Sequence, residues 1–177
     1  AVAISAGWAI FCHQPCRTAE IRPMAQISND QDLRAALEQL SLEQQRRLGG
    51  RFVQSVIHLT QESRVIRAVD SALAADTSPD DLEEAHKAAK SHAIRTYTAC
   101  GKDTDWLAQA DHFVAAAAAA ALLPEGQHEE KASRAWKAAV QARMAKNCEL
   151  METEEGETES EAERQYRIAG GFLAGGS

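Results

Sequence analysis

The sequence predicts an all-α protein, a single-domain bundle of about six to seven helices packed around a central alanine-rich helix. Hydrophobic residues make up 45% of the 177 residues but aromatic residues only 5%. Alanine supplies much of this apolar share, and such a composition suits close helix packing better than a sheet. Apolar residues recur every three or four positions between recognisable helix starts and stops, and no strand pattern is visible after residue 24.

The central helix is expected at 105–122, DWLAQADHFVAAAAAAAL. Asp103 or Thr104 supplies a capping oxygen, and Asp105 places negative charge in the first turn. Pro124 then stops the helix. Because alanine has a high helix propensity and a small side chain, neighbouring helices can approach this segment closely. One face is expected to be buried and carries residues at helical spacing: Trp106, Ala110, Phe113 or Val114, Ala117 and Ala121.

Further helices are expected from the same signals, at 30–40, 42–59, 62–75, 79–99, 128–150 and 160–173. The clearest start is Ser78-Pro79-Asp80-Asp81, which combines a cap, a proline at the first helical position and acids in the first turn. The pair Gly49-Gly50 indicates either a bend or a break within its helix. The core is expected to contain residues from several of these apolar faces: Val56, Val65, Val69, Leu73, Trp106, Phe113, Ala117, Trp136 and Val140.

Residues 1–23 differ in character from the rest, and we expect a poorly ordered leader or extension before a helical domain at 24–177. Cys12, His13 and Cys16 are potential metal ligands, but a structural zinc site needs a fourth, so no metal is expected there. Four cysteines in a chain of this size do not make a disulfide framework, which favours a cytoplasmic location. The longest apolar run, 113–123, is well short of the ~20 residues that cross a membrane.

The charge of the chain is concentrated in one segment. Residues 149–163 contain eight glutamates and no lysine or arginine, and removing these eight from the 26 acidic residues leaves 18 against 19 basic ones. A nearly neutral body with an acidic loop at about 152–160 argues against nucleic-acid binding, which needs a basic face. The loop could speed the capture of a basic protein partner through five glutamates: Glu152, Glu154, Glu155, Glu157 and Glu159. The alternative is that it is a solvated linker.

Five arginines could be drawn as a basic patch: Arg46, Arg47, Arg51, Arg64 and Arg67. Three acids, Glu43, Glu62 and Asp70, are interleaved among them. We therefore expect a solvated face with salt bridges rather than an anion-binding surface.

Few residues form patterns that indicate a catalytic, metal-binding or cofactor-binding site. Glu83 and His86 have the Glu-x-x-His spacing of di-iron bundles, but no second pair exists to complete such a site. Asp105, Gln109 and His112 lie at i, i+4 and i+7, which predicts a polar stripe opposite the buried face of the central helix. No phosphate-binding loop, nucleophile elbow or complete metal set is present, so we expect no cofactor and favour binding over catalysis.

Four segments of the chain carry a resemblance to a known family: HKAAKSHAIRTYTACG, WLAQADHFVAAAAAAALL, SRAWKAAVQARMAKNC and EAERQYRIAGGFL. In their alanine-rich texture they resemble the all-helical immunity proteins of bacterial toxin systems. The resemblance spans about residues 78 to 173 and transfers no functional residue. It implies a small cytoplasmic protein that binds and silences a partner toxin.

The leading hypothesis is therefore a helical protein-interaction module, immunity-like in function. One alternative is a small enzyme or ligand-binding protein with a pocket near His86, Tyr97 and His112. Another is a structural subunit that forms homo-oligomers through its alanine faces. The fold cannot decide among these hypotheses, because helical bundles host unrelated functions.

Overall fold

The computed structural model describes residues 27–97, 104–127, 133–153 and 159–175. Within these ranges the chain forms seven α-helices and two short 3₁₀ helices, and no strand. The elements in chain order are α1 (Asp30–Glu38), α2 (Leu42–Gln54), η1 (Ile57–Leu59), α3 (Ser63–Leu73), α4 (Pro79–Thr96), α5 (Trp106–Ala121), η2 (Glu125–Gln127), α6 (Arg134–Thr153) and α7 (Glu161–Gly175). The prediction of an all-α bundle is confirmed.

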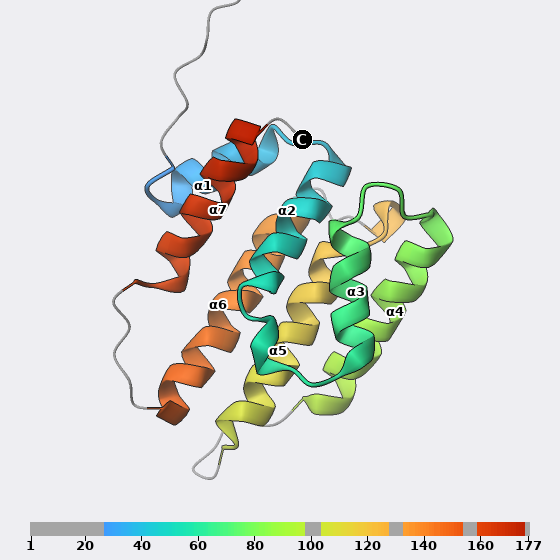
Figure 1. The fold of residues 1–177 in the computed structure, drawn as a ribbon, viewed down its shortest axis with the longest axis vertical. Helices are drawn as coiled ribbons and strands as arrows, with labels where there is room; N and C mark the ends of the chain where they lie inside the picture. Colours follow the sequence, from blue (N-terminus) through green and yellow to red (C-terminus); the bar gives the residue numbers. More distant parts are fainter. Residues whose placement is uncertain (1–26, 98–103, 128–132, 154–158, 176–177) are drawn as a thin grey trace, which may run out of the picture.

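Consecutive helices from α2 to α7 run in alternating directions, and α5 lies in the middle of the bundle (Figure 1). The alanine-rich helix packs against α6, α4, α2 and α3, which makes it the central helix that the sequence predicts. Helices α1 and α7 pack on the side formed by α2 and α6. In the described ranges, no helix combines the length and the apolar character that a bilayer crossing requires.

Most helix ends lie within two residues of their predicted positions, where helices commonly fray. The expected helix at 42–59 is wrong in extent, because α2 ends at Gln54 and η1 follows. The hydroxyl of Ser55 donates a hydrogen bond to the carbonyl of Phe52 at 2.7 Å, and the amide of Val56 bonds Val53 at 3.1 Å. These i−3 bonds tighten the last turn and replace the α-helical pattern.

The glycine pair does not break α2, because the helix continues through both residues. A Cβ at Gly49 would lie 3.1 Å from the Cβ of Ala121 and 3.4 Å from that of Ala138. A Cβ at Gly50 would lie 3.2 Å from the Cβ of Ala72. These glycines therefore let α2 approach α5 and α6 on one side and α3 on the other more closely than any side chain would allow.

The centre of the bundle is filled mainly by alanine and valine rather than by large side chains. Of the predicted core residues, Val56, Val65, Val69 and Ala117 are buried. The other five are only partly buried: Leu73, Trp106, Phe113, Trp136 and Val140. Leu73 and Phe113 pack against the central cluster from its edge, and Trp136 packs against a second cluster. Of the two options for α5, Val114 takes the buried position. Small residues draw the helix axes together, and the space that remains between them does not admit aromatic rings.

A second core cluster joins α1, α2, α6 and α7 around Leu33, Leu48 and Phe172. At the edge of this cluster Arg143 links α6 to α1, because its Nη1 and Nη2 donate hydrogen bonds to the two carboxylate oxygens of Asp30 at 3.0 and 2.8 Å. The hydroxyl of Tyr166 in α7 donates to the same carboxylate at 2.7 Å. These bonds position the first and last described helices relative to α6.

Candidate functional site: the groove between α4 and α5

Two histidines connect the antiparallel helices α4 and α5 in a reciprocal way. Nδ1 of His86 in α4 lies 2.9 Å from the carbonyl oxygen of Ala119, and Nδ1 of His112 in α5 lies 2.8 Å from that of Ala93. Each carbonyl belongs to the last turn of the opposite helix, where helical carbonyls lack partners within the helix. Because a carbonyl only accepts, each Nδ1 donates the hydrogen bond.

These histidines line a shallow cavity of about 500 Å³ between the two helices. Its described lining is mostly apolar and consists of His86, Lys90, Ala93, Ile94, Tyr97, His112, Ala116, Ala119, Ala120, Leu123 and Lys137. Two large side chains in this lining are mostly exposed, Ile94 at 68% and Tyr97 at 70%. We call this cavity and its edge the α4–α5 groove.

The polar atoms of the α4–α5 groove have a defined chemistry. His86 is buried, and its Nε2 has no hydrogen-bond partner. Burial lowers the pKa of His86, which favours the neutral form with Nε2 as an acceptor. The ring of His112 meets Tyr97 edge-on, with centroids 5.5 Å apart. The groove can therefore hold an apolar group, and the buried Nε2 of His86 beside it is an acceptor without a hydrogen-bond partner.

The structure brings together the three residues that sequence reasoning named for a pocket, His86, Tyr97 and His112. The predicted polar stripe on the central helix is wrong as a solvent-facing feature. Gln109 is buried, and Asp105 acts as the helix cap by accepting a hydrogen bond from the amide of Ala108 at 2.9 Å. The three residues do not form one exposed stripe, because Asp105 is exposed, His112 is partly buried and Gln109 is buried.

A buried polar cluster beside the groove was not found by sequence reasoning. Nε2 of His92 lies 2.7 Å from Oδ2 of Asp111, and the hydroxyl of Thr60 donates to the other oxygen of this carboxylate. Thr60 is 3% exposed, so its hydroxyl is not available to a substrate. The cluster therefore joins the η1–α3 connection to α4 and α5. A single aspartate in α5, two residues before the apolar run, was the only signal that could have indicated it.

At the edge of this cluster, Glu62 contributes the cap of α3. Its two carboxylate oxygens accept from Nε and Nη2 of Arg64, each at 3.0 Å. This pair, together with the Arg64 amide, lowers the pKa of Glu62 to about 2. Arg64 thus has the salt-bridged, exposed role predicted for the arginine-rich segment.

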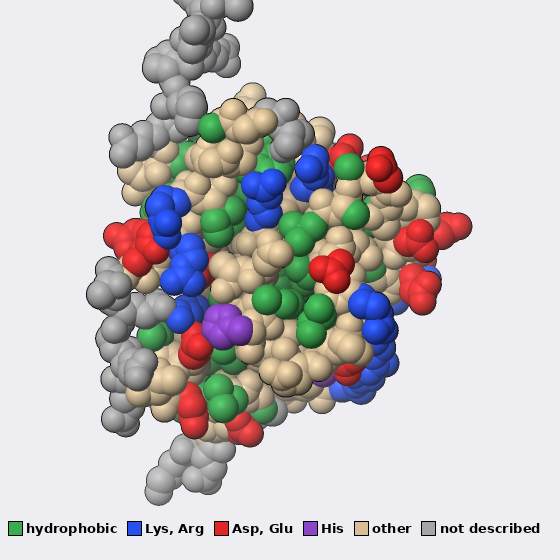
Figure 2. All heavy atoms as spheres, in the orientation of Figure 1, with side chains coloured by type: hydrophobic (Ala, Val, Ile, Leu, Met, Phe, Trp, Pro, Cys, Tyr) green, Lys and Arg blue, Asp and Glu red, His purple; other side chains and the backbone are tan. Residues whose placement is uncertain are grey.

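Arg46 departs from that prediction because it is buried rather than solvated. Its Nη1 donates to the carbonyl oxygens of Ser71, Ala72 and Ala74 at 2.9, 2.7 and 2.8 Å. Arg46 therefore caps the C-terminal end of α3. On the face of the molecule that shows α7, α2 and α3, basic and acidic side chains are intermixed (Figure 2).

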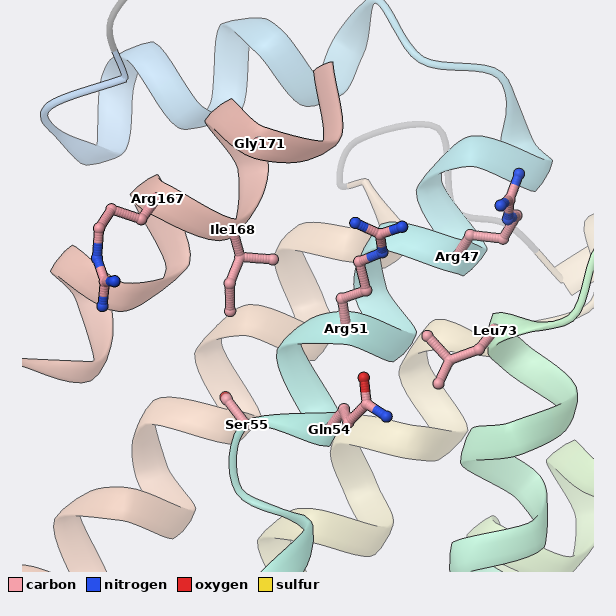
Figure 3. Close-up of a pocket in the computed structure, with 8 residues that line it drawn as sticks. All are labelled: Arg47, Arg51, Gln54, Ser55, Leu73, Arg167, Ile168 and Gly171. Atoms are coloured by element: carbon pink, nitrogen blue, oxygen red, sulfur yellow. The ribbon is translucent and has the colours of Figure 1, made fainter. Parts of the chain in front are cut away.

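A second groove of about 600 Å³ lies between α2 and α7 and is lined by Arg47, Arg51 and Arg167 (Figure 3). The three guanidinium groups point in different directions in this view. Arg51 lies over the ring of Phe172 at 5.0 Å, and both ends of the Arg167 fork bond Glu159. Because the positive charges do not converge on one point, this groove is a weaker candidate for a binding site.

The predicted partner-binding glutamates are only partly described. Glu152 is exposed in the last turn of α6. Glu159 bonds Arg167 and lies 4.0 Å from Arg164, so its charge is partly compensated within the chain. The remaining three, Glu154, Glu155 and Glu157, lie outside the described residues.

The residues considered as metal ligands have other partners or lie outside the described ranges. Glu83 pairs with Lys87, and His86 bonds a backbone carbonyl. The Cys12–Cys16 cluster lies outside the described residues. In the described part of the chain, no three histidine, cysteine, aspartate or glutamate side chains gather as metal ligands would.

Comparison of the chain with models of protein families gives no match, and comparison with curated proteins and with solved structures gives no significant match.

Proposed function

We propose that this chain is a helical protein-interaction module that binds a segment of a partner protein in the α4–α5 groove. The exposure of Ile94 and Tyr97 beside an apolar cavity carries this proposal. Large apolar side chains gathered at one cavity are typical of an interaction site, whereas isolated ones are common on any surface. Tyrosine is also among the residues that most often dominate binding energy at interfaces.

The charges of the groove indicate the chemistry of the partner segment. Two lysines, Lys90 and Lys137, are among the described lining residues, and no acidic side chain is among them. We therefore expect a segment that places one or two large apolar side chains in the groove and a carboxylate near Lys90. The resemblance of the alanine-rich helical segments to immunity proteins suggests a more specific form of this proposal, in which the partner is a toxin.

Selection from a displayed peptide library tests the proposal, with the full chain as target and the double variant Ile94→Ser/Tyr97→Ser as the counter-target. Both positions are exposed, so the double variant should fold normally. We expect enriched peptides to combine aromatic or aliphatic residues with Asp or Glu, and to bind the double variant about ten-fold or more weakly by calorimetry, a loss of ~1.4 kcal/mol or more.

Leu107→Ser is the matched control. Leu107, in α5, is a large apolar residue that is 51% exposed, like Ile94 and Tyr97, but it is not among the described residues that line the groove. Peptide binding should be unchanged in this variant. Enrichment that does not depend on Ile94 and Tyr97, or equal losses in both variants, would refute the proposal. Sedimentation adds a second check: a dimer that the double variant abolishes would identify a second copy of the chain as the occupant instead.

A second candidate function, small-ligand binding at the same groove, is favoured by the unpartnered Nε2 of the buried His86. A ligand with an apolar body and one hydrogen-bond donor would satisfy this acceptor. Phenol and toluene serve as matched probes, since only phenol carries the donor. Binding of phenol in preference to toluene, lost in His86→Phe, would support this function over peptide binding.

A further inference from the structure

Another cavity, of about 460 Å³, is lined by residues at the start of α2, α4 and α6 and by residues that follow α3 and α5, and it shares Leu123 with the α4–α5 groove. These helix ends lie together at one end of the bundle (Figure 1). Much of its lining is apolar and includes Leu42, Leu82, Leu122, Leu123 and Pro124. Two arginines, Arg46 and Arg134, also line it, and both are only 4% exposed. Buried arginines beside an apolar cavity are unusual, because a buried cation needs a partner.

Arg46 donates hydrogen bonds to the carbonyls at the end of α3, whereas part of the Arg134 guanidinium group has no hydrogen-bond partner. Nε and Nη2 of Arg134 are both buried without a hydrogen bond. These two N–H groups form the fork with which arginine binds both oxygens of a carboxylate. In the same protein, the Nε/Nη2 fork of Arg64 binds Glu62, and that of Arg167 binds Glu159.

The surroundings of this fork favour an anion of low charge. The N-terminal ends of α2, α4 and α6 contribute partial positive charge, and the C-terminal ends of α3 and α5 contribute partial negative charge. Burial lowers the pKa of Arg134; of its charged neighbours, Glu125 raises this pKa and Arg46 lowers it. Three exposed carboxylates, Glu43, Glu83 and Glu125, also line the cavity and repel an anion, and this repulsion increases with the charge of the ligand. Glu83 is paired with Lys87, which reduces its effect.

We propose that this cavity binds a small organic monocarboxylate, with the carboxylate on the Nε/Nη2 fork of Arg134 and the apolar body against the leucines. The cavity has the size of a small-molecule site, with a few polar groups set in an apolar wall. Inorganic phosphate offers the same oxygen geometry but no apolar body and more charge, so it should bind weakly. This proposal does not rest on the function proposed for the α4–α5 groove.

Calorimetry of the full chain with three probes tests the site. Benzoate should bind, benzamide should bind about ten-fold or more weakly because it lacks the charge, and inorganic phosphate should bind more weakly than benzoate. Arg134→Met should abolish benzoate binding, and Arg134→Lys should weaken it because lysine keeps the charge but loses the fork. The control Arg67→Met removes an exposed arginine elsewhere and should change nothing.

Thermal unfolding without ligand gives an independent readout. An arginine whose fork is buried and unpaired destabilises the fold, so Arg134→Met should unfold at a higher temperature than the wild type, whereas a purely structural arginine would give the opposite shift. If Arg134→Met does not fold, Leu82→Trp tests the same site, because the larger side chain should fill the cavity and abolish benzoate binding. Absence of benzoate binding, equal binding of benzamide, or tighter binding of phosphate would overturn the proposal.

Discussion

At the scale of single residues, helix ends in this bundle are held by polar side chains from neighbouring helices. His86, His112 and Arg46 each bond carbonyl groups in the last turn of another helix. The sequence shows none of these bonds, because a histidine or arginine on a helix face has the same local signature whether it meets solvent or a carbonyl. The partner of such a residue is fixed only by tertiary packing.

The reciprocal histidine bonds should contribute measurably to stability. We expect His112→Phe to keep the ring contacts with Tyr97 and Phe113 but to lose the bond to the carbonyl of Ala93. The expected loss is about 1–2 kcal/mol in the free energy of unfolding, since a partly buried carbonyl is left unpaired. Urea denaturation of both proteins measures this difference, and equal midpoints with equal slopes would show that the bond contributes nothing.

The ion pair between Asp30 and Arg143 should make stability depend on pH. The hydrogen bond from Arg143 lowers the pKa of Asp30 below its ordinary value of 3.8. The carboxylate therefore adds stability above pH 3.8, and this contribution is lost as pH falls through the lower folded-state pKa. Denaturation of the wild type and Asp30→Asn at several pH values between 6 and 2 tests this. Their difference in stability should be constant at high pH and shrink at the acidic end; a constant difference throughout would contradict the assignment.

At the scale of elements, helix positions could be predicted well because caps, prolines and apolar periods are local signals. Ser78-Pro79 does begin α4, and Ser41 with Gln44 does form the capping box of α2. The buried faces were harder to predict. Hydrophobicity favoured Trp106, Phe113 and Trp136 as core residues, whereas close helix packing placed alanines at the centre and the rings at the edges.

Glycines in two helices should respond to alanine in opposite ways. A Cβ added at Gly170 in α7 would meet no atom within 4 Å, so Gly170→Ala should stabilise the protein by about 0.5–1 kcal/mol through helix propensity alone. Gly49→Ala should lower stability, because the new methyl group would lie 3.1 Å from Ala121 on the central helix. Thermal unfolding of both variants provides the comparison. A gain at Gly49 as large as that at Gly170 would mean that α2 and α5 are not in close contact.

The central helix should not tolerate larger side chains. Ala117 is fully buried, so Ala117→Leu should cost about 1–3 kcal/mol by overpacking. Ala35 lies exposed on α1, and Ala35→Leu is the control that should be nearly neutral. An unchanged melting temperature for Ala117→Leu would contradict the position of α5 at the centre of the bundle.

At the scale of the whole molecule, the alanine-rich centre directs function to the surface. Small side chains fill the centre of the described bundle, and the two cavities discussed above lie between helix edges or at the end of the bundle. The sequence could predict the bundle, and the hypothesis of a pocket near His86, Tyr97 and His112 named residues that line the same groove. It could not predict the exposure of Ile94 or the unpaired fork of Arg134, because both depend on which side chains from other helices the fold brings near these residues.

The central claim is that the α4–α5 groove is the partner-binding surface, and chemical-shift mapping of the full chain tests it most directly. On addition of a peptide selected from the displayed library, the largest shifts in backbone amide and methyl signals should cluster on the groove, at residues such as Ala93, Ile94, Ala116 and Ala119. Shifts that cluster instead on the groove between α2 and α7, or on the acidic segment at 152–160, would contradict the claim.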